Sequence, residues 1–140
     1  MRIILLSSGA MTGKTSTFHE IYKCLTQGMS PPPIKAFWKK TNDFECEFTY
    51  KKQTVALYSS GDTILSKKAP CIIEAIIKYS HVDCLVLAHR TGGPERTRIA
   101  NIVNACQQHK VFPKTVVSNG GKAAEDAANR NDAQAIVKLI

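Results

Sequence analysis

Residues 3–15 limit what this chain can do more than any other stretch, and they read Ile3-Ile4-Leu5-Leu6-Ser7-Ser8-Gly9-Ala10-Met11-Thr12-Gly13-Lys14-Thr15. The aliphatic run at the start predicts a short buried strand, and the small residues that follow allow the chain to turn. After the turn, apolar residues recur at helical spacing as Phe18, Ile21, Tyr22 and Leu25. A strand, a loop of small residues and a helix in this order can hold a phosphate group, because the first N–H groups of the helix point at the anion.

The loop carries the residue types that phosphate binding requires. Its small side chains let successive backbone N–H groups curl around β- and γ-phosphates. Lys14 would add a positive charge between those phosphates, and the Thr15 hydroxyl would ligate Mg²⁺. Ser8 stands where the pattern G-x-x-x-x-G-K-[ST] has its first glycine, and serine fits there if its φ stays negative. The residues predicted to contact the nucleotide are Gly9, Ala10, Met11, Thr12, Gly13, Lys14, Thr15 and Ser16.

These residues resemble the phosphate-binding loop of the P-loop NTPase superfamily, whose members bind ATP or GTP with Mg²⁺. The carboxyl-terminal part resembles the ending of small nucleotide and metabolite kinases, with a strand, the turn Asn119-Gly120-Gly121 and a final helix. In those families the turn after the last strand borders the nucleotide base. The resemblance therefore implies base contact by Asn119 and Gly120, and a simple Asn-Gly turn is the alternative.

Composition and charge limit the class of protein. The 140 residues, 44% of them apolar, predict one globular domain over residues 1–140. No stretch approaches transmembrane length, so we expect a cytoplasmic protein without a membrane partner. The five cysteines are scattered without metal-binding spacing, which predicts buried thiols. The net charge of +8 favours an anionic partner, and nucleic acid is possible but not favoured because no basic run is interleaved with several aromatic residues.

Strands and helices are predicted to alternate along the chain. Apolar or alternating runs predict strands over residues 3–7, 43–49, 53–59, 83–88 and 114–118, of which 43–49 belongs at a sheet edge. Helical spacing predicts helices over 13–25, 70–79, 94–109 and 132–139, whereas 28–42 is a loop and 123–133 a polar helix or a loop. The predicted fold class is α/β: a P-loop three-layer sandwich with a mainly parallel five-stranded sheet and helices on both faces.

Candidate catalytic residues follow from a rule for such sheets, in which ligands bind beyond the carboxyl ends of the strands. Asp62 follows the strand over 53–59 and is the preferred carboxylate, either for Mg²⁺ or as a base, with a turn or N-cap role as the alternative. Asp83 precedes its strand and is assigned to the opposite edge. Arg90 and Arg96 follow that strand, and their planar groups would neutralise a transferring phosphoryl group. Trp38 would stack on an acceptor or pack under the proline loop.

The combination predicts a kinase-like phosphotransferase that moves the γ-phosphate of ATP, or of GTP, to a small acceptor with the help of Mg²⁺. The acceptor should be small, since little chain is left for a separate acceptor domain. Tyr58 and Ser59 occupy the positions where a strand-terminal aspartate is usual. This favours the alternative, a non-catalytic nucleotide-binding or nucleic-acid-associated module. A GTPase is disfavoured because no Asn-Lys-x-Asp sequence is present to bind guanine.

Overall fold

The computed structural model describes residues 1–9, 12–37, 42–61, 72–91, 101, 104–105 and 108–140. Its strands are β1 (Arg2–Ser8), β2 (Ala36–Phe37), β3 (Phe44–Tyr50), β4 (Gln53–Tyr58), β5 (Cys84–Arg90) and β6 (His109–Pro113). Its helices are α1 (Lys14–Thr26), α2 (Ile72–Lys78) and α4 (Gly121–Val137). The predicted first strand and first helix are thus present to within one residue at each end.

The strands form one six-stranded mixed sheet in the order β2-β3-β4-β5-β1-β6. Strands β4, β5, β1 and β6 are parallel, whereas β3 is antiparallel to both β2 and β4. The predicted mainly parallel, five-stranded P-loop sandwich is therefore wrong. Only Lys51 and Lys52, with φ of 48° and 66°, join β3 to β4. Two residues allow a hairpin but not a parallel crossover, which needs about a dozen residues or more.

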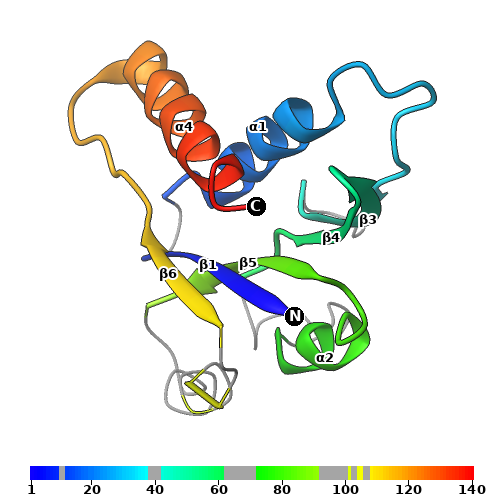
Figure 1. The fold of residues 1–140 in the computed structure, drawn as a ribbon. Coiled ribbons are helices and arrows are strands. Elements are labelled where there is room, and N and C mark those ends of the chain that lie inside the picture. Colours follow the sequence, from blue (N-terminus) through cyan, green and yellow to red (C-terminus); the bar gives the residue numbers. More distant parts are fainter. Residues whose placement is uncertain (10–11, 38–41, 62–71, 92–100, 102–103, 106–107) are drawn as a thin grey trace.

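Helices cover both faces of the sheet. Figure 1 shows α1 and α4 side by side on one face and α2 on the other. Because side chains alternate along a strand, Ile4 and Leu6 of β1 pack under α1 and α4, whereas Ile3 and Leu5 pack in the α2 layer. Strands β1, β4 and β5 therefore lie between two hydrophobic layers, and β1 leads from these layers to the loop before α1.

The last strand and the last helix differ from their predicted positions. The strand predicted over residues 114–118 lies earlier, as β6, and its exposed residues at the sheet edge lack the apolar run that marks a buried strand. Residues 94–109 were predicted as a helix; most of them lie outside the described residues, the described residues 101, 104 and 105 are helical, and His109 begins β6. The polar stretch 123–133 is helical, as part of α4. Within the predicted loop 28–42, Ala36 and Phe37 form β2 against β3.

The described cysteines are thiols in or near the core. Cys46 and Cys84 are buried, and Cys24 is half-buried. Burial raises the pKa of the Cys46 thiol to about 12, so this group stays protonated and unreactive at neutral pH. Among the helices of the described residues, none has the length and apolar character to cross a membrane.

Candidate phosphate-binding site

The loop between β1 and α1 has the backbone that phosphate binding requires at both of its described ends. Ser8 is the last residue of the extended strand β1, so it meets the condition of a negative φ. Gly13 caps α1 with φ 79° and ψ 19°, a left-handed conformation that favours glycine. A Cβ on Gly13 would also stand 3.4 Å from Asn129 Oδ1 of α4. Ala10 and Met11, at the middle of the loop, lie outside the described residues.

Lys14 places its ammonium group over the start of the loop. Its Nζ donates a hydrogen bond to the carbonyl oxygen of Gly9 and another, of 3.3 Å, to Ser8 Oγ. The Ser8 and Thr12 hydroxyls are hydrogen-bonded to each other, and Thr12 Oγ1 donates to the Gly9 carbonyl at 3.2 Å. A Cβ on Gly61, just beyond β4, would lie 3.4 Å from Lys14 Cε. The loop and Gly61 therefore flank the half-buried Lys14 side chain.

Thr15 contacts a carboxylate that the sequence analysis had not selected. Thr15 Oγ1 donates a hydrogen bond of 2.6 Å to Asp43 Oδ1, and Ser59 Oγ donates to the same oxygen at 3.3 Å. Ser59 is 1% exposed, and its Oγ also accepts the backbone N–H of Phe44 at 2.8 Å. The Asp43 carboxylate is thus held against the first turn of α1 by a buried hydroxyl.

Strand direction explains how Asp43 reaches this position. It immediately precedes β3, which runs antiparallel to β4, so the start of β3 lies at the edge where β1, β4 and β5 end. Only residues that follow a strand were expected at this edge, so Asp62 was predicted there. Asp62 lies outside the described residues. The sequence feature that could have predicted the position of Asp43 is the two-residue connection between β3 and β4, because so short a connection requires a hairpin.

Arg90 lies at the same edge, as predicted from its place at the end of a strand. It is the last residue of β5 and stands in register with Ser8, and the next residue, Thr91, donates its N–H to the Ser8 carbonyl at 3.0 Å. The Arg90 side chain is half-buried. Arg96 lies outside the described residues. Asp83 is at the opposite edge, where its Oδ2 accepts the N–H of Thr54 at 2.8 Å.

His19 follows Thr15 by one turn of α1 and lies beside the residues before β3. Its Nε2 is 3.2 Å from the carbonyl oxygen of Asn42, and its ring centroid is 4.8 Å from that of Phe44. Burial is the main cause that lowers the pKa of His19, so the ring is neutral at pH 7. Trp38, predicted either to stack on a base or sugar or to pack under the proline loop, lies outside the described residues.

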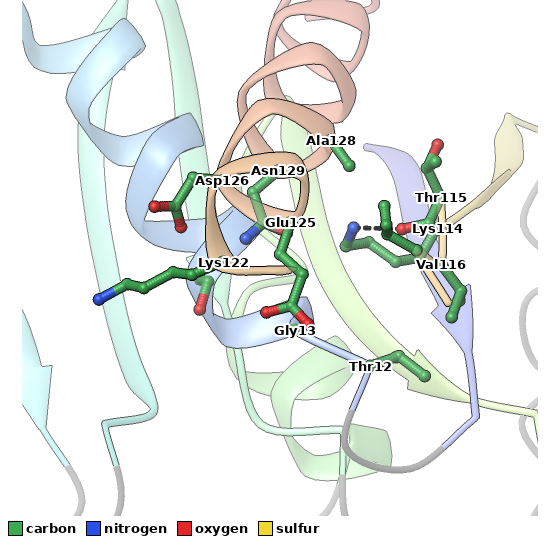
Figure 2. A pocket seen from close by; sticks show the side chains of 12 residues that line it. Thr12, Gly13, Lys114, Thr115, Val116, Lys122, Glu125, Asp126, Ala128 and Asn129 are labelled. Carbon is green, nitrogen blue, oxygen red and sulfur yellow. Dashed lines mark hydrogen bonds between the residues drawn. The ribbon is translucent and has the colours of Figure 1, made fainter. Parts of the chain in front are cut away.

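A pocket of about 370 Å³ adjoins the loop on the side of α4. Figure 2 shows its walls: the start of α1 and its loop, the segment after β6, and the first turns of α4. The lining residues are Thr12, Gly13, Ser16, Lys114, Thr115, Val116, Val117, Lys122, Glu125, Asp126, Ala128 and Asn129.

Asn119 and Gly120, which the resemblance implicated in base contact, are not among the residues that line this pocket. Gly120 is closely packed, since a Cβ there would stand 2.5 Å from Val117 Cγ1 and 2.6 Å from Ala124 Cβ. The turn therefore sets how closely α4 approaches the pocket wall.

A buried ion pair holds the wall formed by residues 114–117 against α4. Lys114 Nζ lies 3.0 Å from Asp132 Oδ2, and their side chains are only 2% and 5% exposed. Asp132 also accepts the Thr115 N–H at 2.9 Å and the Thr115 hydroxyl at 2.7 Å. Both carboxylate oxygens are engaged, so this aspartate holds the pocket wall in place.

Searches of protein-family models, of curated proteins and of solved structures found no match to this chain. In the described part of the chain, no three His, Cys, Asp or Glu side chains are grouped so that they could hold a metal ion by themselves. A metal at this site would need oxygen ligands from a bound phosphate as well.

Proposed function

We propose that the chain binds a nucleoside triphosphate with Mg²⁺ through residues 9–16 and transfers the γ-phosphoryl group to a small acceptor. The observation that carries this proposal is the 2.6 Å hydrogen bond from Thr15 Oγ1 to Asp43 Oδ1. It brings a carboxylate to the hydroxyl that follows Gly13-Lys14, at the start of a helix. Phosphoryl transfer requires a carboxylate in this neighbourhood, to hold a metal ion or to take the proton of the attacking hydroxyl.

The donor set fits Mg²⁺. This ion prefers oxygen ligands and binds through one or two carboxylates, water and substrate phosphates. Thr15 and Asp43 offer a hydroxyl and a carboxylate in direct contact, and Ser59 orients the carboxylate. When bound, the ion would bridge phosphate oxygens and neutralise the charge that develops on them.

The remaining residues bind and orient the phosphates. Lys14 supplies a positive charge at the start of the loop, and the N-terminus of α1, where a helix favours bound anions, follows directly. Arg90, in register with Ser8, would offer a planar pair of donors to the phosphoryl oxygens. The non-catalytic alternative was favoured because Tyr58 and Ser59 stand where a strand-terminal aspartate is usual. Asp43 would supply a carboxylate at this edge of the sheet. We therefore prefer transfer over binding alone.

The test is the thermal stability of the full chain with and without nucleotide. ATP or GTP with Mg²⁺ at a hundred times its Kd should stabilise the wild type by about 2.7 kcal/mol. Lys14→Ala should remove this shift, because it deletes the charge that meets the phosphates. Lys23→Ala is the matched control, since Lys23 lies on the same helix, is exposed and pairs with Glu20. The proposal is wrong if the wild type shows no shift with millimolar nucleotide, or if Lys14→Ala keeps it.

A further inference from the structure

The pocket beside the loop is within reach of anything attached to a phosphate held there. Thr12, Gly13 and Ser16 belong both to the predicted phosphate contacts and to the pocket lining. The volume of about 370 Å³ is at the lower end of the range of small-molecule sites, about 300–1,000 Å³. A nucleoside joined to phosphates in the loop can therefore occupy this pocket.

The opposite walls of the pocket differ in chemistry. The segment after β6 contributes Val116 and Val117, which offer apolar surface to the flat face of a base. The first turns of α4 contribute the carboxylates of Glu125 and Asp126, together with the Lys122 ammonium and the Asn129 amide, as Figure 2 shows. The Lys114 ammonium, although it lines the pocket, is engaged by Asp132 and by the Thr115 carbonyl.

Ionised carboxylates only accept hydrogen bonds, which discriminates among the bases. Guanine presents two adjacent donors on its pairing edge, the ring N1–H and the exocyclic N2 amino group. Adenine and cytosine present an amino group beside a ring nitrogen that accepts, and uracil presents one N–H between two carbonyls. A carboxylate meets two donors only on guanine, and charge-assisted pairs of this kind are the stronger hydrogen bonds.

We infer that the pocket between the loop and α4 selects guanine, so that the nucleotide is GTP rather than ATP, through the carboxylates of Glu125 and Asp126. This inference rests on the proposed function, because it requires that the phosphates lie in the loop. The sequence leaves the choice between ATP and GTP open, and it contains no Asn-Lys-x-Asp motif for binding guanine.

The experiment measures the Kd of GTP, ATP and inorganic triphosphate, each with Mg²⁺, by calorimetry on the full chain. The wild type should bind GTP at least about tenfold more tightly than ATP, a difference of roughly 1.4 kcal/mol. The double variant Glu125→Gln, Asp126→Asn should bind inorganic triphosphate at least as well as the wild type and lose the preference for GTP. Both side chains are exposed, so the variant should keep its fold, which circular dichroism checks. The control Glu20→Gln, Glu47→Gln removes two negative charges outside the pocket lining and should keep the preference.

The results separate the two proposals. If inorganic triphosphate binds but the wild type does not prefer GTP, the guanine inference is overturned and the phosphate site stands. A preference that survives in the double variant also overturns the inference, since the carboxylates are then not its cause. If neither triphosphate nor GTP binds, the proposed function fails, and the guanine inference fails with it.

Discussion

Asp43 and Asp83 each come immediately before a strand, yet they lie at opposite edges of the sheet. Asp43 precedes β3 and accepts hydrogen bonds from Thr15 and Ser59, beside the loop. Asp83 precedes β5 and accepts the backbone N–H of Thr54 at the far edge. The difference is strand direction, because β5 is parallel to β1 and β4, whereas β3 is antiparallel to β4. A carboxylate before a strand can therefore reach the ligand edge of an α/β sheet when that strand is reversed.

A third aspartate, Asp132, is buried in the contact between α4 and the segment after β6. It is 5% exposed and binds Lys114 and Thr115, whereas Asp43 contacts side chains of the proposed site. The three aspartates should therefore respond to substitution in different ways. Substitution of Asp132 should lower the stability of the fold, and substitution of Asp43 should lower turnover. Substitution of Asp83 should have little effect on either.

The largest effect is expected for Asp132→Ala, which leaves the buried Lys114 ammonium without its partner. Breaking a buried pair in this way costs about 3–5 kcal/mol, measurable as the free energy of unfolding in denaturant. Asp126→Ala is the control on the same helix, since Asp126 is exposed, and it should cost less than about 0.5 kcal/mol. Equal losses in the two variants would show that the ion pair does not hold the pocket wall.

The next effect is expected for Asp43→Asn, which keeps the shape of the side chain and removes its charge. Nucleotide turnover should fall by about a hundredfold or more, the usual contribution of a positioned acid or base. The matched control Asp83→Asn should keep the turnover of the wild type, because its carboxylate lies at the other edge. If Asp43→Asn turns over nucleotide normally, the carboxylate has no catalytic part. Binding without turnover in the wild type would instead support the non-catalytic alternative.

The smallest effect concerns His19, which lies next to the segment that carries Asp43. Burial lowers the pKa of His19 below 6.5 in the folded state, so protonation favours the unfolded chain. The stability contributed by the neutral ring is therefore present above pH 6.5 and is lost as the pH falls from there through the folded-state pKa. The melting temperature should fall further between pH 7.5 and pH 5.5 in the wild type than in His19→Gln. An equal fall in both would contradict this assignment.

Local sequence sufficed to predict the first strand, the loop and the first helix. Apolar runs and helical spacing are properties of neighbouring residues, and the left-handed Gly13 needs no distant contact to be favoured there. The last strand was predicted in the wrong place, because β6 is defined by its pairing with β1 and has no apolar run. The sheet was predicted to be mainly parallel, because the turn residues Lys51 and Lys52 are not the usual Asn-Gly of a hairpin.

Three consecutive residues carry the chemistry predicted for the loop: Gly13 for the turn, Lys14 for the charge and Thr15 for the hydroxyl. The contact between Asp43 and Thr15 exists only in the folded chain, because the hairpin brings Asp43 from 28 residues away to the carboxyl edge of the sheet. The tertiary structure also decided where a pocket adjoins the loop, since Asp132 ties the segment after β6 to α4. The direction of β3 follows from its two-residue connection to β4, whereas the packing of α4 against the pocket wall is set by contacts between residues that are distant in the sequence.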